Sequence, residues 1–293
     1  MSQPDALHIA YEDHHLSFNL EAGAPIVQLI LGQNGERHTV IDGVNGPANP
    51  WLFPFPNRLA HGEYSFEGKT YRFPINDHDE RPNSLHGFIR KEAFALGNQG
   101  TDGHGSWTSL VYDYDGSLEY YPFPFRLTFK YTLSATGLTI EVTTENTGDT
   151  NLPAGLGWHP YFALPTGVDG ASLKLPPCQE IEVDDFTMIP TGKKWPSTCF
   201  DSPRDLDGVK LDTCFELSKK GEPNSTFVKT EGFEVEIWQD AQHQFIQVFT
   251  SVNRKTLAVE PMTCGINAFN TGEGLKVLPA GETWTASCGV KLV

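Results

Sequence analysis

Two titratable residues of this chain each stand directly before a proline, at the end of an aromatic or apolar run. His159 lies in Gly157-Trp158-His159-Pro160-Tyr161-Phe162, and Glu260 lies in Leu257-Ala258-Val259-Glu260-Pro261-Met262. A residue before proline is driven out of the helical region into an extended conformation, which points its side chain off one face of a sheet. An imidazole and a carboxylate are common general acids and bases, so these two residues are candidates for proton transfer.

The neighbouring residues indicate a function more strongly for Glu260 than for His159. Glu260 follows an apolar run, and burying an unpaired carboxylate costs on the order of several kcal/mol, so it must pair with a cation or meet a polar ligand. Burial would also raise its pKa towards that of a useful general base. For His159 the residues alone leave two options open. Its neighbours Trp158, Tyr161 and Phe162 could belong to the core, or could stack on the apolar face of a sugar ring.

Three further polar positions have both a structural and a functional interpretation. Arg58, which follows Asn57 after a proline-rich approach, offers a planar fork of donors suited to vicinal hydroxyls or a carboxylate, although a single arginine is more often part of a surface ion pair. His86 precedes Gly87, whose freedom permits a tight turn or a close approach, but a histidine there is more often a hydrogen-bonded structural residue. Asp212 interrupts a mixed apolar run, as a strand end would.

Several other chemistries lack their motifs. The chain contains no H-E-x-x-H, P-loop, G-x-G-x-x-G or nucleophile-elbow sequence, and neither His14-His15 nor His78-Asp79-Glu80 has the spacing of a known metal motif. No cysteine lies in an electropositive sequence setting that would activate a thiolate. The sequence therefore predicts neither a metal ion nor a cofactor.

The net charge and the cysteine content limit the possible partners and the cellular compartment of the protein. The formal net charge is −16 and the pI is about 4.9, which argues against nucleic acid and against an anionic membrane surface. The five cysteines are scattered and odd in number, which fits a reducing compartment. The N-terminal segment Met1–Asp5 does not resemble a signal peptide, and no stretch resembles a transmembrane span. We therefore expect a cytoplasmic protein, as a monomer or a homodimer.

The elements that must position these residues alternate with a period of two. Leu127 to Leu133 and Leu138 to Val142 predict a pair of strands, Tyr64 to Phe73 predicts a hairpin turning at Gly68, and Trp284 to Leu292 predicts a C-terminal strand. No window of helical length keeps a 3.6-residue period, and 28 glycines and 21 prolines punctuate the chain. These patterns predict an all-β fold, with residues 1–293 forming one large single-domain antiparallel β-sandwich that has a concave face.

The order of the polar motifs resembles that of a known family. Asn57-Arg58, Asn83-Ser84-Leu85-His86-Gly87, His159-Pro160-Tyr161-Phe162 and Glu260 follow one another as in the aldose 1-epimerase (galactose mutarotase) family. The segments 62–71 and 121–124 resemble its hairpin and its proline-aromatic turn, so the resemblance spans about residues 50–280. The segment 260–270 is more similar to the uncharacterised bacterial branch than to the well-known galactose mutarotases. The resemblance implies a galactose mutarotase-like supersandwich.

The resemblance also implies a role for each candidate. Glu260 would be the general base and His159 the general acid in opening and reclosing a cyclic hexose, which interconverts its α and β anomers. Arg58, His86 and Asn57 would bind the sugar and position its ring oxygen, and Asp212 would accept hydrogen bonds from sugar hydroxyls. The partner would be a small-molecule monosaccharide, with no cofactor and no metal.

Three alternatives remain at this stage. A hexose-6-phosphate mutarotase would need further basic residues at the pocket, which Arg90 or Lys91 could supply. A non-catalytic carbohydrate-binding domain on the same fold would not need an acid and a base together. A hydrolase or lyase would want a second catalytic carboxylate, for which Asp212 is the one candidate.

Overall fold

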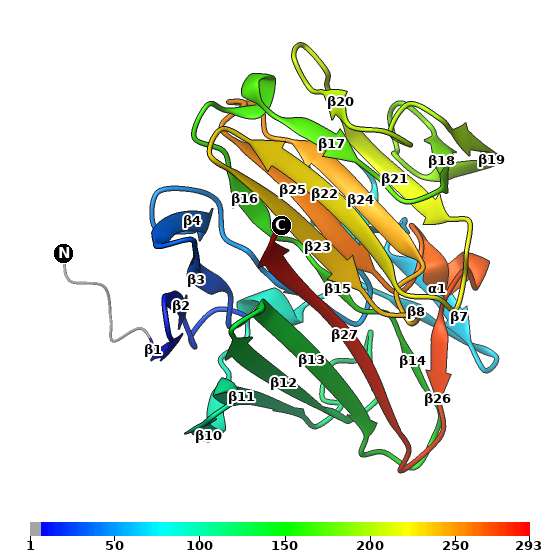
Figure 1. The fold of residues 1–293 in the computed structure, drawn as a ribbon. Coiled ribbons are helices and arrows are strands. Elements are labelled where there is room, and N and C mark those ends of the chain that lie inside the picture. The colour runs from blue at the N-terminus through cyan, green and yellow to red at the C-terminus, as the bar shows by residue number, and fades with distance from the viewer. Residues whose placement is uncertain (1–6) are drawn as a thin grey trace.

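The computed structural model describes residues 7–293, and most of these lie in antiparallel strands (Figure 1). The expectation about a signal segment at Met1–Asp5 lies outside the described residues. The all-β prediction is confirmed: within the described part, helical turns are limited to η1 (Ile89–Lys91), η2 (Val168–Gly170) and α1 (Ala268–Thr271). No helix in residues 7–293 has the length and apolar character needed to span a bilayer.

The first large sheet has twelve strands among the described residues. Its main path, in spatial order, is β1 (Leu7–Tyr11), β2 (His14–Phe18), β3 (Ile26–Gln33), β4 (Glu36–Asp42), β16 (Tyr161–Ala163), β25 (Thr256–Met262), β24 (Phe245–Thr250), β21 (Asp212–Leu217), β18 (Cys178–Val183) and β19 (Pro190–Ser197). Two short strands, β5 (Trp51–Leu52) and β15 (Gly157–Trp158), extend it beside β25.

The second large sheet has nine strands. Their order is β10 (Ala95–Asp102), β11 (Gly105–Tyr114), β12 (Phe125–Ser134), β13 (Gly137–Asn146), β27 (Thr283–Leu292), β23 (Phe233–Gln239), β22 (Asn224–Thr230), β17 (Ser172–Lys174) and β20 (Arg204–Asp205). Figure 1 shows β27, the red C-terminal strand, running between β13 and β23. Three two-stranded sheets pair β14 (Leu152–Ala154) with β26 (Lys276–Leu278), β6 (Arg58–Ala60) with β9 (Asn83–Leu85), and β7 (Glu63–Phe66) with β8 (Lys69–Arg72).

The predicted strands and hairpin are confirmed in register. In β12 every second residue from Phe125 to Leu133 is buried, and the strand pairs with β13 through Leu133 opposite Leu138. The β7–β8 hairpin turns at Glu67 and Gly68, whose φ values of 49° and 79° are both positive. A two-residue turn of this hand matches the twist of the flanking strands. The alternation of apolar and polar residues in the sequence thus correctly predicted which side chains face inward.

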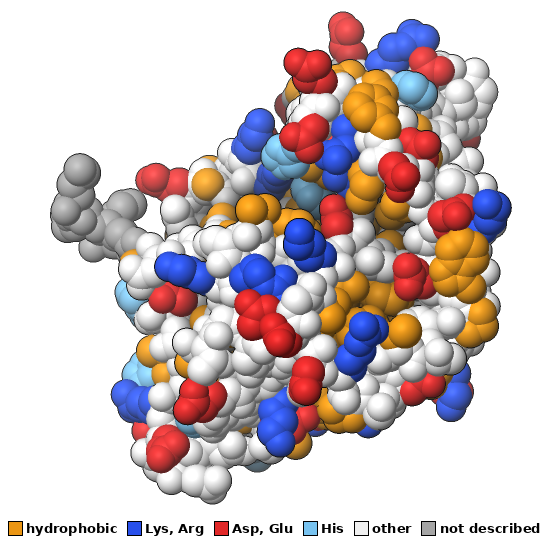
Figure 2. Space-filling view, turned by 90° about the horizontal axis from the view of Figure 1, so that it is seen from above, with side chains coloured by type: hydrophobic (Ala, Val, Ile, Leu, Met, Phe, Trp, Pro, Cys, Tyr) orange, Lys and Arg blue, Asp and Glu red, His pale blue; other side chains and the backbone are white. Residues whose placement is uncertain are grey.

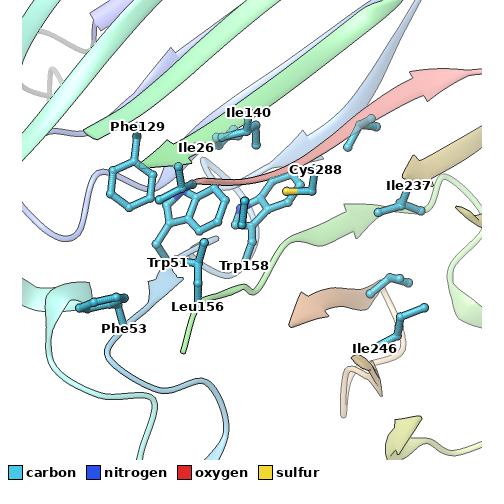
Figure 3. Close-up of a cluster of buried hydrophobic side chains, with 14 of the residues drawn as sticks. Ile26, Trp51, Phe53, Phe129, Ile140, Leu156, Trp158, Ile237, Ile246 and Cys288 are labelled. Atoms are coloured by element: carbon cyan, nitrogen blue, oxygen red, sulfur yellow. The ribbon is translucent and has the colours of Figure 1, made fainter. Parts of the chain in front are cut away.

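A shared core joins the two large sheets. One cluster of buried side chains includes Ile26 and Val259 from the first sheet and Phe129 and Val290 from the second. Figure 3 shows part of this cluster, with the two indole rings of Trp51 and Trp158 next to each other. Their ring centroids lie 5.7 Å apart in a stacked arrangement. Outside the core, acidic and basic side chains are interspersed on the face seen in Figure 2 rather than gathered in one block.

One buried hydrogen bond across the sandwich gives a stability prediction. Trp51 Nε1 donates to Tyr131 Oη at 2.8 Å, and both side chains are fully buried. Replacing Tyr131 by Phe leaves the indole N–H without an acceptor, which costs about 1–3 kcal/mol. Urea denaturation should show a loss of that size in the free energy of unfolding. Tyr11→Phe, which removes an exposed hydroxyl bonded to the Gly103 carbonyl, is the matched control. Equal small effects of the two variants would contradict the prediction.

Candidate active site

The candidate site is built on one face of the first sheet. Along β25, Leu257 and Val259 join the core shared with the second sheet, so Glu260 points to the opposite face. The same alternation in β24 sends Ile246 and Val248 into the core and Gln247 to the face of Glu260, directly opposite it in register. The strand continues past Glu260 to Met262.

His159 and Glu260, the two sequence candidates for proton transfer, meet in this site. His159 Nε2 lies 3.1 Å from Glu260 Oε1, and their side chains are 12% and 1% exposed. In this ligand-free structure the two groups are in direct contact. Among the described residues, His159 Nδ1 and Glu260 Oε2 are buried without a hydrogen-bond partner. Buried polar atoms of this kind are uncommon and mark places where a ligand can bind.

The backbone on both sides of His159 is fixed. His159 lies between β15 and β16, where its N–H donates to the Pro50 carbonyl at 3.0 Å and the Tyr161 N–H donates to Asn49 Oδ1 at 2.7 Å. The open question about the aromatic neighbours is answered by their burial. Trp158 and Phe162 are fully buried core residues, whereas Tyr161 stacks on the His159 ring with centroids 4.7 Å apart and lines the pocket.

Burial controls the protonation of the pair. Burial raises the pKa of Glu260 well above its ordinary value, with the charge of Asp212 adding to this and that of Arg58 opposing it. Burial also lowers the pKa of His159 to about 4, and the charge of Arg90 acts in the same direction. Because the two groups are in contact, these pKa values belong to the pair. Burial therefore favours the uncharged form of each group, which is a protonated carboxyl and an unprotonated imidazole.

Asn57 and His86 form a reciprocal clamp beside the pair. The His86 N–H donates to the Asn57 carbonyl at 2.8 Å, and the Asn57 N–H donates to His86 Nδ1 at 3.1 Å. Both residues have positive φ, 56° and 67°, which is uncommon away from glycine. Gly87 permits a close approach as expected, but to the backbone of Phe53 rather than to a ligand, since a Cβ would lie 2.1 Å from the Phe53 oxygen. The clamp holds the His86 ring at the pocket.

A chain of hydrogen bonds joins Asp212 to Asn57 through Gln247, which was not among the sequence candidates. Gln247 Nε2 donates to Asp212 Oδ1 at 2.7 Å, and Asn57 Nδ2 donates to Gln247 Oε1 at 3.1 Å. Asp212 is exposed at the pocket mouth, yet enough protein surrounds the carboxyl for burial to raise its pKa. Gln247 interrupts the apolar run Phe245–Phe249 as Glu260 interrupts its own, and that signal could have found it.

All six sequence candidates line one cavity of about 130 Å³. Its lining consists of Asn57, Arg58, His78, Leu85, His86, His159, Tyr161, Asp212, Gln247, Phe249 and Glu260. A larger surface groove of about 480 Å³, lined by residues such as His38 and Phe233, contains none of them. Within residues 7–293, no three His, Cys, Asp or Glu side chains are grouped as a metal site. The arrangement offers a proton donor and acceptor surrounded by hydrogen-bonding groups.

Comparison with known proteins decides the family. The family model described as aldose 1-epimerase matches residues 19–291. The chain belongs to the aldose 1-epimerase family. It is 30% identical to the uncharacterised protein YihR of Escherichia coli K12 over 79% of this chain and 74% of YihR. It is 33% identical to the galactose mutarotase of Rattus norvegicus, over half of this chain and 42% of the rat protein.

Solved structures confirm the supersandwich fold of this aldose 1-epimerase family member. A galactose mutarotase-like protein from Clostridium acetobutylicum superposes with a TM-score of 0.84 at 20% identity, covering 98% of this chain and 95% of that protein. An aldose epimerase homologue from C. elegans gives a TM-score of 0.82 at 20% identity, covering 99% and 98%. At this identity the likeness establishes the fold, and the similarity to YihR fits the bacterial branch expected from the sequence.

The clamp predicts the tautomer of His86. Because Nδ1 accepts a hydrogen bond from a backbone N–H, the ring proton must lie on Nε2. Burial, together with the charges of His159, Arg90 and Arg58, places the pKa of His86 well below 6.5. We expect ¹⁵N NMR, with the resonances assigned through His86→Asn, to show a neutral Nε2–H ring that does not titrate between about pH 6 and 8. A titration centred near pH 6.5 would contradict the clamp.

Proposed function

We propose that this protein is an aldose 1-epimerase that interconverts the α and β anomers of a neutral hexose. The observation that carries the proposal is the contact of His159 with Glu260 inside a pocket of hydrogen-bonding side chains. Family membership supports the reaction class, and a galactose mutarotase is among the relatives. A purely carbohydrate-binding domain would have no need for a buried carboxyl and a buried imidazole that share a proton.

The pair can open and reclose the ring without a net change in its own charge. Glu260, as the carboxylate, takes the proton from the anomeric hydroxyl while O1 forms a double bond to C1. The bond from C1 to the ring oxygen breaks, its electron pair stays on the ring oxygen, and His159, as the imidazolium, protonates that oxygen. After rotation about the C1–C2 bond, the reverse steps close the ring on the other face of the aldehyde. Each positioned proton-transfer group typically contributes about 10²–10⁴-fold.

The direct contact in the ligand-free structure sets the starting point for this chemistry. Burial favours the neutral forms of both residues, so the proton rests on Glu260 before a sugar binds. A shift of that proton across the 3.1 Å contact produces the carboxylate and imidazolium that ring opening needs. The anomeric hydroxyl and the ring oxygen then take the places that the two side chains occupy for each other. His86 and Arg58 lie in the same lining to orient the sugar.

The charges of the lining favour a neutral sugar. Two carboxyl groups, Asp212 and Glu260, line the cavity, and Arg58, the guanidinium in the lining, is already paired with a buried aspartate. Arg90 and Lys91, which could have served a 6-phosphate, lie outside the lining, and Lys91 is exposed. The pocket itself therefore supplies no uncompensated cation for a phosphate.

One observation supports a hexose with an anionic group at C6 as the second candidate. Arg90 is close enough for its charge to lower the pKa of both His159 and His86. Its Nε is buried without a partner in residues 7–293, and no carboxylate of that part of the chain forms an ion pair with it. Such a sugar would need the Arg90 side chain to turn towards the cavity.

Two substitutions test the proposal. Glu260→Gln removes the base and His159→Asn removes the acid, and each should lower the polarimetric rate of anomer interconversion by about 10²–10⁴-fold. Both should keep the melting temperature, and Glu260→Gln should match or exceed the wild type, because it removes a carboxyl whose burial is unfavourable. Glu216→Gln and His243→Asn, which change buried residues outside the pocket, are matched controls that should keep full activity.

The same assay separates the alternatives. Fresh α-D-galactose, α-D-glucose and glucose 6-phosphate should lose their excess optical rotation at different enzyme-dependent rates, with a neutral sugar fastest. A preference for the phosphate that Arg90→Gln abolishes would support the second candidate instead. Wild-type rates in both Glu260→Gln and His159→Asn would rule out the assigned acid and base. Sugar binding without any acceleration by the wild type would indicate a binding domain.

A further inference from the structure

Arg58 depends on a partner that lies outside the acid–base pair. Its side chain is 9% exposed, and Nε donates to Asp77 Oδ2 at 2.9 Å. The Asp77 side chain has no exposed surface at all. A guanidinium this far removed from water needs a nearby anion, and breaking such a pair leaves an uncompensated buried charge. Among the lining residues, the placement of Arg58 therefore depends on a carboxylate behind it.

The Asp77 carboxylate is itself fully engaged. Asn83 Nδ2 donates to Oδ2 at 2.9 Å, and the His78 N–H donates to Oδ1 at 2.8 Å. The same Asn83 group also donates to the Thr187 carbonyl at 2.7 Å, which ties this loop to the segment between β18 and β19. Burial acts to raise the pKa of Asp77, but the bonds from Asn83 and Arg58 outweigh it, so the group stays ionised. Asp77 is thus a fixed anchor.

The anchor determines which part of Arg58 faces the site. Because Nε is bound to Asp77, the terminal nitrogens are left for other partners, and Nη1 lies 3.4 Å from Asn57 Oδ1. The charge of Arg58 lowers the pKa of Asp212 and of Glu260, against the effect of their burial. Moving the guanidinium by even a small distance would change the donors that a bound sugar meets.

We propose that Asp77 is a positioning residue, which holds Arg58 by Nε so that its terminal nitrogens meet the sugar. This inference rests on the proposed epimerase function. Asp77 lies outside the cavity lining and touches no reacting atom, so its effect must pass through Arg58. Its neighbour His78 lines the pocket directly. Two successive residues of this loop therefore contribute to sugar binding. Asp77 lies behind the cavity lining, and His78 forms part of it.

A double-mutant cycle tests this assignment. Asp77→Asn keeps the size of the side chain but removes the anion, and it should raise KM about tenfold while kcat changes by less than about threefold. Arg58→Gln should raise KM at least as much. In the Arg58→Gln background, Asp77→Asn should change KM by less than about twofold, because the group through which it acts is gone. Asp79→Asn, which changes a 78% exposed carboxylate of the same loop, is the matched control.

Two results would overturn the assignment. One is an Asp77→Asn enzyme with the KM of the wild type. The other is a double variant whose increase in KM equals the product of the increases in the two single variants. If Asp77→Asn is recovered unfolded, Asp77→Glu replaces it in the cycle, because it keeps the charge and displaces it, with the same expectation of non-additivity. Binding of D-galactose by calorimetry is measured in parallel. A wild type that binds the sugar without turning it over would contradict the proposed function, while the binding cycle would still test Asp77.

Discussion

The site depends on one constraint, the burial of a carboxyl and an imidazole against each other on the inner strands of a sheet. Glu260 can sit in β25 with 1% exposure because His159 Nε2 lies 3.1 Å from its Oε1. Neither residue alone would be stable as an ion there, since an unpaired buried charge is costly. Packing holds both residues in place. Stacked tryptophans anchor the strand before His159, and the common core covers the other face of the strand that contains Glu260.

Several other polar groups of the site are also paired before any ligand arrives. Asp212 and Asn57 meet through Gln247, and Arg58 meets Asp77. Only the Glu260–His159 pair keeps buried oxygen and nitrogen atoms unused in the described residues around the cavity. The unused hydrogen-bonding capacity therefore lies on the two residues that the proposed ring opening requires.

Much of the fold could be predicted because the alternation of apolar and polar residues along each strand is visible in the sequence. The period-two pattern of β12, β13 and β27 identified the buried face, and the position of Gly68 identified a hairpin turn. The same reasoning found His159 and Glu260 through their prolines. It did not find Asp77, whose importance arises from a partner distant in sequence, and it missed Gln247 although that residue interrupts an apolar run. Asp77 lies in the loop before β9 and pairs with Arg58 of β6, and Gln247 lies opposite Glu260 in the register of β24 with β25.

The central claim is that the active form of the site is a buried pair holding a single proton. The most direct test is the pH dependence of kcat/KM for anomer interconversion, which reports the ionisation of the free enzyme. Because burial lowers the pKa of His159 to about 4, the pair gains a second proton and loses its base only as the pH falls towards that value. We expect an acidic limb near pH 4 and a rate that is constant through pH 6.5. An acidic limb centred near pH 6.5, the ordinary value for histidine, would contradict it.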